Sequence, residues 1–464
     1  MNFSGFLKFV FVITLFATFR PLASAQECRC LSCENPLGQR GPHWDRYWQE
    51  LNDNVRKRAR GLSPPANLQG STQVVFLDFD SGDDGNFNYT PAIRDAIQAE
   101  VENIYERFNV SFTQVIPGGD FSTLFFNEGG VGGGLAMDTD FRNLNPNDTA
   151  VINLDIGLAP PDVVPLNTLV AAHELGHLLG LRHADMFGPI GTGVIGGFSS
   201  FYDPFYPGPT DAFDEAVDHV MVTGAFGIPF SALVEPSWFS ERSATKLTFA
   251  EFGNTMQDTE GNDSIAEAQP LPLQSLNVPN TIVVGQNASD SDFSVSAAVV
   301  EGTLNFAGDQ QDVFEITGRT GDIFNIQVLS NIPDRLSVDP IDPNVSVFDA
   351  TGNFVDYYGT DAFNESEIKA PDCDMIDLIL PADGTYFIEV DSLSAESGVY
   401  ELFVYRFNGF IGDVNCDGET NLLDVMPFVD AIISGEFLPK ADTNFDGAVD
   451  LLDVSSFVDL LTGT

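Results

Sequence analysis

The stretch HELGHLLGLRH, residues 173–183, decides how this 464-residue chain is interpreted, and it holds three of the five histidines. His173 and His177 are four positions apart, so on a helix both imidazoles project from one face about one turn apart. That spacing suits two ligands of one metal ion. Gly180 permits a turn with positive φ, which would bring His183 back as a third ligand.

Three imidazoles leave one position of a tetrahedral zinc ion open for water, which is the arrangement of a catalytic site. Zinc lowers the pKa of bound water from 15.7 toward about 7. Glu174 follows the first ligand directly and is expected to accept a proton from that water. The alternative is a buried helix whose histidines are core residues, and the third histidine at this spacing argues against it.

The pattern HExxHxxGxxH resembles the signature of the metzincin zinc endopeptidases. The resemblance implies an α+β protease domain in which the three histidines hold one catalytic zinc ion and Glu174 is the general base. It also implies a methionine turn beneath the metal. Met221 lies 38 positions after His183 and is the candidate, with Met186 as the alternative.

Two positions depart from particular metzincin subfamilies. Ala184 follows the third histidine, where astacins have glutamate, and Thr223 stands two residues after Met221, where astacins and serralysins have tyrosine. The subfamily stays open, and transition-state stabilisation would rest on zinc and backbone donors.

Length and composition indicate an exported multidomain protein. A chain of 464 residues predicts about three domains, and its 43% hydrophobic content is enough for packed cores. The net charge of −48 excludes nucleic acid as a partner. Calcium-binding loops and a solvated acidic surface are the two expected sources of that charge.

Residues 1–25 read as a secretory signal peptide, with Lys8, an apolar core over 9–19 and the A-x-A site 23–25. Arg20 interrupts the apolar run, and no later stretch reaches the ~20 apolar residues that span a bilayer. A secreted or cell-surface protein with no membrane span is expected.

The odd number of cysteines leaves at least one unpaired; they are Cys28, Cys30, Cys33, Cys373 and Cys416. The first three could tie down the N-terminus, pair with another chain, or hold the zinc in a latent form, as matrixin pro-segments do. Residues 26–70 are interpreted as a pro-segment, with a short helix from Trp44 to Arg58.

Residues 71–257 are predicted to form the metalloprotease domain. Strands are expected at 73–79, 111–115 and 151–154, with an amphipathic helix over 93–108. Asn167 or Thr168 is expected to cap the helix that carries the histidines, and a closing helix is expected over 239–249. The metzincin resemblance also implies that the strand after the glycine run 129–134 is a sheet edge that pairs with substrate. The long loop 185–218 would wall the pocket.

Residues 258–408 are predicted to form an all-β sandwich, because short alternating stretches recur between turn residues. This part resembles a bacterial pre-peptidase C-terminal domain at 261–266, 308–314 and 382–386. In that family the domain trails secreted proteases and is often removed on maturation.

Residues 409–464 contain one calcium-loop pattern twice, shifted by 29 positions, with glycine at position 6 and aspartate at position 12. Two structural calcium ions are expected. The candidate ligands at positions 1, 3, 5, 7, 9 and 12 are Asp413, Asn415, Asp417, Glu419, Asn421 and Asp424 in the first loop, and Asp442, Asn444, Asp446, Ala448, Asp450 and Asp453 in the second.

The pattern resembles a type I dockerin, a small all-α, EF-hand-type pair that docks onto cohesins. Leu422-Leu423 and Leu451-Leu452 occupy loop positions 10 and 11, which dockerins often use for recognition. These leucines form either a docking face or the core. A cohesin-like scaffold protein is the partner that the resemblance implies.

These features together predict a secreted zinc endopeptidase that hydrolyses protein or peptide substrates and is tethered by a calcium-dependent tail. The alternative is an adhesive or scaffold component of the cell surface with a latent or self-processing protease module.

Overall fold

A computed structural model shows how the chain folds. It describes residues 72–80, 88–126, 133–152, 154, 160–186, 219–221, 234, 237–259, 261–279, 281, 292–305, 311–330, 341–359, 373–392, 397–407, 411–414, 420–434, 439–444 and 449–462. The predicted signal peptide, the pro-segment, the helix 44–58, Cys28, Cys30, Cys33, Cys416, Thr223 and most of the loop 185–218 lie outside this part. Cys373 is fully buried.

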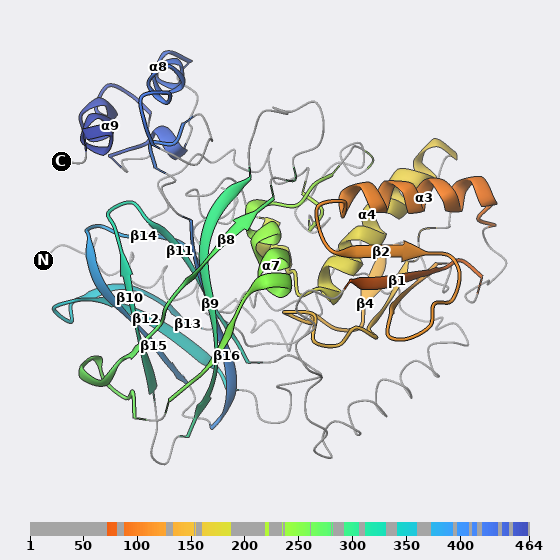
Figure 1. Cartoon of the computed structure of the whole chain (residues 1–464), viewed down its shortest axis with the longest axis horizontal. Helices are drawn as coiled ribbons and strands as arrows, with labels where there is room; N and C mark the ends of the chain where they lie inside the picture. Colours follow the sequence, from red (N-terminus) through yellow and green to blue (C-terminus); the bar gives the residue numbers. More distant parts are fainter. Residues whose placement is uncertain are drawn as a thin grey trace, which may run out of the picture.

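An α/β layer holds the histidine stretch (Figure 1). Its sheet has the order β2-β1-β3-β5-β4 and is parallel except for β4, which runs antiparallel to β5. The strands are β1 (Gln73–Asp78), β2 (Val110–Thr113), β3 (Ser122–Phe126), β4 (Gly134–Ala136) and β5 (Thr149–Ile152). The strand predictions for this region are confirmed.

Helices α3 (Pro91–Ile104) and α4 (Pro160–Leu178) pack on this sheet and on each other. The core between them contains Ile97, Val101, Leu124, Ile152 and Leu175, all fully buried. The predicted amphipathic helix is confirmed as α3. Thr90 accepts a hydrogen bond from the backbone N–H of Ile93, and Pro91 occupies the first turn, where a missing N–H costs nothing.

The predicted start of the histidine helix was wrong. Asn167 and Thr168 lie inside α4, because the helix begins two turns earlier, at Pro160. Each side chain has another partner: Asn167 accepts a hydrogen bond from the hydroxyl of Tyr89 at 2.7 Å, and Thr168 donates to Glu100 at 3.1 Å. The prolines near the start of α4 gave no sign of the earlier start. A proline in the first turn is nevertheless compatible with a helix.

Two antiparallel-rich sheets form the predicted β-sandwich. One sheet has the order β13-β12-β15-β10-β7 and the other β14-β11-β16-β9-β6, with β8 paired to β9. The strands are β6 (Thr255–Gln257), β7 (Gln269–Pro270), β8 (Gln274–Val278), β9 (Phe293–Leu304), β10 (Gln311–Gly318), β11 (Ile323–Leu329), β12 (Pro343–Asp349), β13 (Phe354–Gly359), β14 (Cys373–Ile379), β15 (Gly384–Ser392) and β16 (Gly398–Phe407). A short helix, η4 (Ile265–Glu267), precedes β7.

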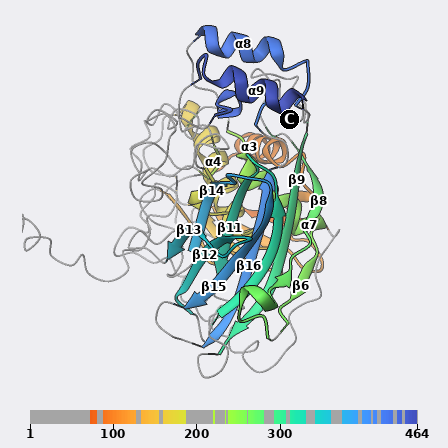
Figure 2. The ribbon, with the colours of Figure 1, turned by 90° about the vertical axis from the view of Figure 1, so that its left-hand side faces the viewer.

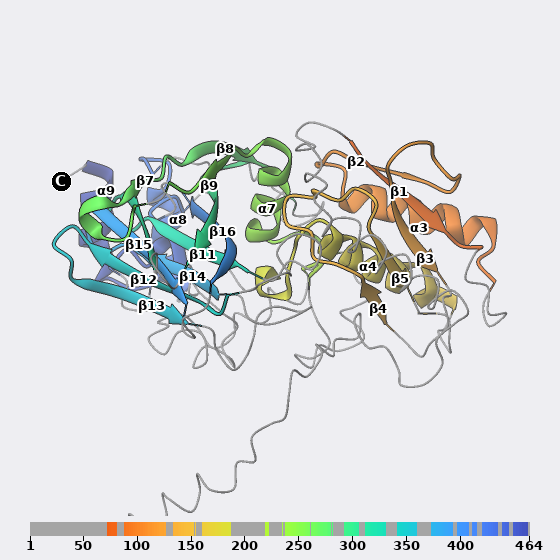
Figure 3. The same cartoon turned by 90° about the horizontal axis from the view of Figure 1, so that it is seen from below.

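The second sheet of the sandwich is buried on both faces. Leu402 and Val404 of β16 point into the core between the sheets, whereas Phe403 and Tyr405 belong to a different cluster on the outer face. That outer cluster includes residues of helix α7 (Glu241–Phe252), which Figure 1 and Figure 3 show between the sandwich and the α/β layer. The helix predicted over 239–249 is confirmed, and Ser240 caps it.

The C-terminal segment forms a pair of helices, α8 (Val425–Ser434) and α9 (Asp453–Thr462), with a short helix η5 (Pro439–Ala441) between them. Figure 2 shows the pair at one end of the sandwich. Phe428 and Phe457, which are 29 positions apart, stack with ring centroids 3.9 Å apart at the centre of a small core. Within the described residues, no helix is long and apolar enough to span a bilayer.

A buried carboxyl group in the second sandwich sheet should make the stability of the protein depend on pH. Asp374 of β14 accepts a hydrogen bond from Gln327 at 2.7 Å, and burial raises its pKa to about 6 although Lys246 opposes the shift. The folded state therefore holds this proton more tightly than the unfolded chain, so the carboxyl destabilises the fold as pH rises through about 6.

We expect Asp374→Asn to raise the free energy of unfolding relative to the parent, by little at pH 4 and by up to about 3 kcal/mol at pH 8. Urea unfolding of both proteins at the two pH values measures this difference. A gain that does not depend on pH, or a loss at pH 8, contradicts the assignment.

Candidate metal centre

The last turn of α4 and the segment after it bring three histidines together. His173 and His177 lie one turn apart on α4, and His183 begins the short helix η1 (His183–Met186). Between them Gly180 has φ +90°, and a Cβ at this position would lie 2.3 Å from the backbone Cα of Phe141. The predicted turn at Gly180 is confirmed, and both its backbone angle and its close packing require glycine.

The three imidazoles converge through their Nε2 atoms. His173 Nε2 lies 3.0 Å from His183 Nε2 and 3.1 Å from His177 Nε2. All three rings are buried, and among the described residues they form a group able to hold a metal ion. Two Zn–N bonds of about 2.0–2.1 Å at a tetrahedral angle place their nitrogens about 3.3 Å apart, close to the separations here.

Backbone carbonyls fix which ring nitrogens face inward. Nδ1 of His173 lies 2.9 Å from the carbonyl of Val220, and Nδ1 of His177 lies 2.9 Å from the carbonyl of Leu181. A carbonyl only accepts, so each Nδ1 carries the proton and each Nε2 presents a lone pair. Metal-binding histidines are oriented in this way in known sites. Lone pairs that face each other at 3 Å repel unless a cation lies between them.

The protonation states agree with this interpretation. Burial and the neighbouring imidazoles hold the pKa values of His173 and His183 well below their ordinary value. Burial lowers the pKa of His177 to about 4. The three rings are therefore neutral at pH 7, which is the form that binds a metal. Neutral nitrogen donors of this kind fit zinc.

Glu174 is fully buried beside the triad, facing β4. Burial raises its pKa well above the ordinary value, and the backbone of Ala136 offsets part of that shift without completing a hydrogen bond of ordinary geometry. A Cβ on Gly134 would lie 2.4 Å from Oε1 of Glu174. Glycine in β4 therefore makes room for the buried carboxyl group.

Met221 packs beneath the helix. Its side chain is buried, and its Sδ lies 2.6 Å from the position that a Cβ on Gly176 would occupy, between the first two histidines. The adjacent Val220 supplies the carbonyl that orients His173. The structure therefore places Met221 against the histidine helix; the side chain of the alternative, Met186, lies outside the described part.

Sequence reasoning missed several residues that support the triad. Asp185 accepts hydrogen bonds from the backbone N–H of Arg182 at 2.7 Å and from Nζ of Lys246 at 2.8 Å. These bonds tie the backbone on both sides of His183 to helix α7. Its position two residues after a ligand was a usable signal. No sequence pattern connects it with Lys246, which lies 61 positions away.

The described calcium-loop residues repeat one hydrogen-bond pattern. Asp424 accepts from the N–H of Asn421, and Asp453 accepts from the N–H of Asp450, both at 2.8 Å. Several predicted ligands are buried: Asp413, Asp424, Asp442 and Asp453. Asn444 donates its backbone N–H to Asp453 at 3.1 Å. The predicted ligands Asn415, Asp417, Glu419, Asp446 and Ala448 lie outside the described residues.

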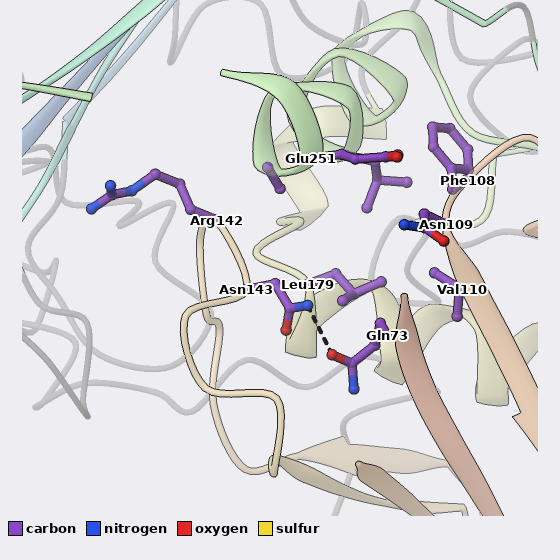
Figure 4. A pocket seen from close by; sticks show the side chains of 10 residues that line it. Gln73, Phe108, Asn109, Val110, Arg142, Asn143, Leu179 and Glu251 are labelled. Atoms are coloured by element: carbon purple, nitrogen blue, oxygen red, sulfur yellow. Dashed lines mark hydrogen bonds between the residues drawn. The ribbon is translucent and has the colours of Figure 1, made fainter. Parts of the chain in front are cut away.

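A separate pocket lies between α7 and the α/β sheet, away from the triad (Figure 4). It is lined by Gln73, Phe108, Asn109, Val110, Arg142, Asn143, Leu179, Leu247, Ala250 and Glu251. It contains none of the three histidines and not Glu174. Residues 187–218, predicted to wall the substrate pocket, lie outside the described part.

Comparison with known proteins gives no family. No family model matches the chain, and no curated protein matches it. Among solved structures, it is similar to the pre-peptidase C-terminal domain of collagenase from Bacillus anthracis, with 18% identity over 23% of this chain and 86% of that domain and a TM-score of 0.17.

A second similar structure is PliG, a periplasmic inhibitor of g-type lysozyme from Aeromonas hydrophila, with 14% identity over 33% of this chain and 99% of that one and a TM-score of 0.19. A third is the lipase BlEst2 of Bacillus licheniformis in its propeptide form, with 10% identity over 75% and 76% of the two chains and a TM-score of 0.21. These matches are too weak to assign an activity.

The geometry predicts a metal site that requires all three histidines. We expect the purified chain to bind one zinc ion, and His183→Gln to lower the affinity for zinc at least about tenfold. Glu174→Gln is the matched control, because it changes a buried neighbour that is not a ligand, and it should keep the metal. Competition with a fluorescent zinc chelator measures all three proteins. Equal affinity in the parent and His183→Gln would contradict the assignment.

Proposed function

We propose that this chain is a secreted zinc-dependent endopeptidase. The observation that carries the proposal is the triad of neutral imidazoles with a buried carboxyl group of raised pKa, Glu174, beside it. The sequence pattern HExxHxxGxxH and the packing of Met221 under the helix support the same proposal. The A-x-A site at 23–25 supports export.

The chain's own residues supply the proton transfers. Glu174 accepts a proton from the attacking water, and its raised pKa then lets it return that proton to the leaving amine. His173, His177 and His183 hold the metal, and the carbonyls of Val220 and Leu181 fix two of the rings. Bound there, zinc supplies Lewis-acid polarisation of the scissile carbonyl and of water.

The edge strand β4 supports a peptide as substrate. It is the last strand of the sheet in the order β2-β1-β3-β5-β4, and Gly134 of this strand contacts Glu174. An extended peptide that adds to a sheet edge gains backbone hydrogen bonds without requiring a particular sequence. A peptide on β4 would pass beside the carboxyl group that transfers the proton.

We expect Glu174→Gln to lower kcat/KM for an unfolded protein substrate by about 10²–10⁴-fold while zinc stays bound. The matched control is Glu251→Gln, a half-buried glutamate of α7 that lines the separate pocket and should keep full activity. Fluorescence release from labelled casein, with zinc content measured on the same samples, tests this.

Activity that survives in Glu174→Gln would contradict the protease proposal. A parent chain that binds zinc but cleaves nothing would favour the alternative function, an adhesive or scaffold component with a latent protease module.

We further propose that the C-terminal helix pair is a calcium-stabilised docking module. Buried carboxylates at equivalent positions of both loops support calcium binding, because such charges need a cation or hydrogen bonds to be stable. The helices leave an apolar face exposed, which supports a protein partner such as a cohesin-like scaffold. It comprises Leu422, Leu423, Met426, Val429 and Ile433 in the first repeat and Leu451, Leu452, Val454 and Val458 in the second.

Calcium titration of the full chain should show two sites, and Asp424→Asn should leave one with unchanged affinity. Asp430→Asn, which changes an exposed carboxylate of α8, is the matched control and should keep both. Isothermal titration calorimetry measures the stoichiometry. Two full-affinity sites in Asp424→Asn would contradict the calcium-binding role.

Capture by an immobilised cohesin-like module should disappear in excess chelator. Capture that does not depend on calcium would contradict the docking role.

A further inference from the structure

Two buried ionic contacts join the β-sandwich to the segments that hold the metal ligands. The first centres on Arg142, in the loop between β4 and β5. Its guanidinium contacts Glu401 of β16 at 2.7 Å, Glu301 of β9 at 2.6 Å and Thr255 of β6 at 2.6 Å. Arg142 and Glu401 are 5% and 2% exposed, so neither charge has water as a substitute partner.

The loop of Arg142 also contacts the metal-binding turn. Asp140 donates its backbone N–H to the carbonyl of His177 at 3.2 Å, and the backbone of Phe141 packs directly against Gly180. Arg142 itself has φ +71°, a conformation that a side-chained residue adopts only when its surroundings hold it. Figure 4 shows its side chain extending away from the other residues that line the pocket.

The second contact runs through α7. Lys246 pairs with Asp185 at 2.8 Å, with both side chains 1% exposed, and Asp185 lies two residues after His183. One turn earlier in the same helix, Arg242 pairs with Asp377 of β14 at 2.5 Å, and both are again buried. Helix α7 therefore connects the third ligand's segment with the second sheet of the sandwich.

Apolar packing between the two ionic contacts is continuous. Phe403 of β16 lies 4.9 Å from Phe141 and 5.1 Å from Phe249 of α7, measured between ring centroids. These residues share one buried cluster with the outer face of the sandwich sheet. Removal of the sandwich would expose this cluster and leave Arg142 and Arg242 without their carboxylate partners.

We propose that the β-sandwich is a permanent part of the metalloprotease unit and is not a removable C-terminal domain. Arg142 and Lys246 are positioning residues: they transmit the contact with the sandwich to the turn between His177 and His183. The inference rests on the metal site of the proposed function, but its test reads metal affinity and ligand geometry and does not read proteolysis.

The first experiment uses the full chain in the Glu174→Gln background, loaded with Co²⁺ as a spectroscopic probe. Glu401→Gln, a change made in the sandwich, should lower the affinity for Co²⁺ about tenfold or more and alter its visible absorption bands. Glu301→Gln, whose side chain is 39% exposed, should have a smaller effect in the same direction. Asp322→Asn, which removes an ion pair with Arg406 within the sandwich, is the matched control and should match the parent.

The positioning role would be overturned if Glu401→Gln and Glu301→Gln matched the control in affinity for Co²⁺ and in absorption spectrum. In that case, metal binding by the parent would still support the proposed function. A parent that binds no Co²⁺ would overturn both.

The second experiment tests permanence. A recognition site for a specific protease is inserted between Glu260 and Gly261, next to a glycine whose Cβ position has no neighbour within 4 Å. After cleavage under native conditions, the two fragments should co-elute in size-exclusion chromatography and keep the parent's affinity for Co²⁺. Fragments that separate, with the N-terminal one retaining that affinity, would overturn the proposal.

Discussion

The convergence of three buried imidazoles on one point is the constraint on which the rest of the α/β layer depends. Nε2 of His173 lies 3.0 Å from that of His183 and 3.1 Å from that of His177. The carbonyls of Val220 and Leu181 hold the protons of His173 and His177 on Nδ1, away from this point. The turn at Gly180, the space left by Gly134 and the packing of Met221 all serve this arrangement. A cation in the centre removes the repulsion that the geometry creates.

The surroundings of the triad explain why a β-sandwich belongs in the same folded unit. A turn that carries metal ligands must be held within a fraction of an ångström, and short loops seldom achieve this without support. Here the support comes from Phe141 and Arg142 on one side of the turn and from α7 on the other. The two segments pack against the second sandwich sheet and form buried ion pairs with it. The outer face of that sheet carries buried apolar side chains such as Phe403 beside buried ion-pair partners such as Glu401, because the sheet is an internal layer of the folded unit.

Much of this could be predicted from the sequence, because the relevant signals are local. Spacing alone predicted that the three histidines come together and that the chain turns at Gly180, and alternation predicted the sandwich strands β11, β12, β15 and β16. The start of α4 was missed, because Asn167 or Thr168 was expected to cap the helix, whereas Asn167 lies inside it and its side chain bonds to Tyr89. The pairing of Arg142 with Glu401, 259 positions away, has no local signal. The four consecutive apolar or aromatic residues 402–405 of β16 were an available hint that its sheet is covered on both faces.

X-ray absorption at the zinc edge of the purified chain would decide whether the three histidines hold zinc, since it reports the donor atoms whether or not the chain is active. We expect three imidazole nitrogens at about 2.0–2.1 Å from the zinc, with one additional oxygen. Absence of zinc, or a first shell with sulfur at about 2.3 Å and fewer than three imidazoles, would contradict this expectation.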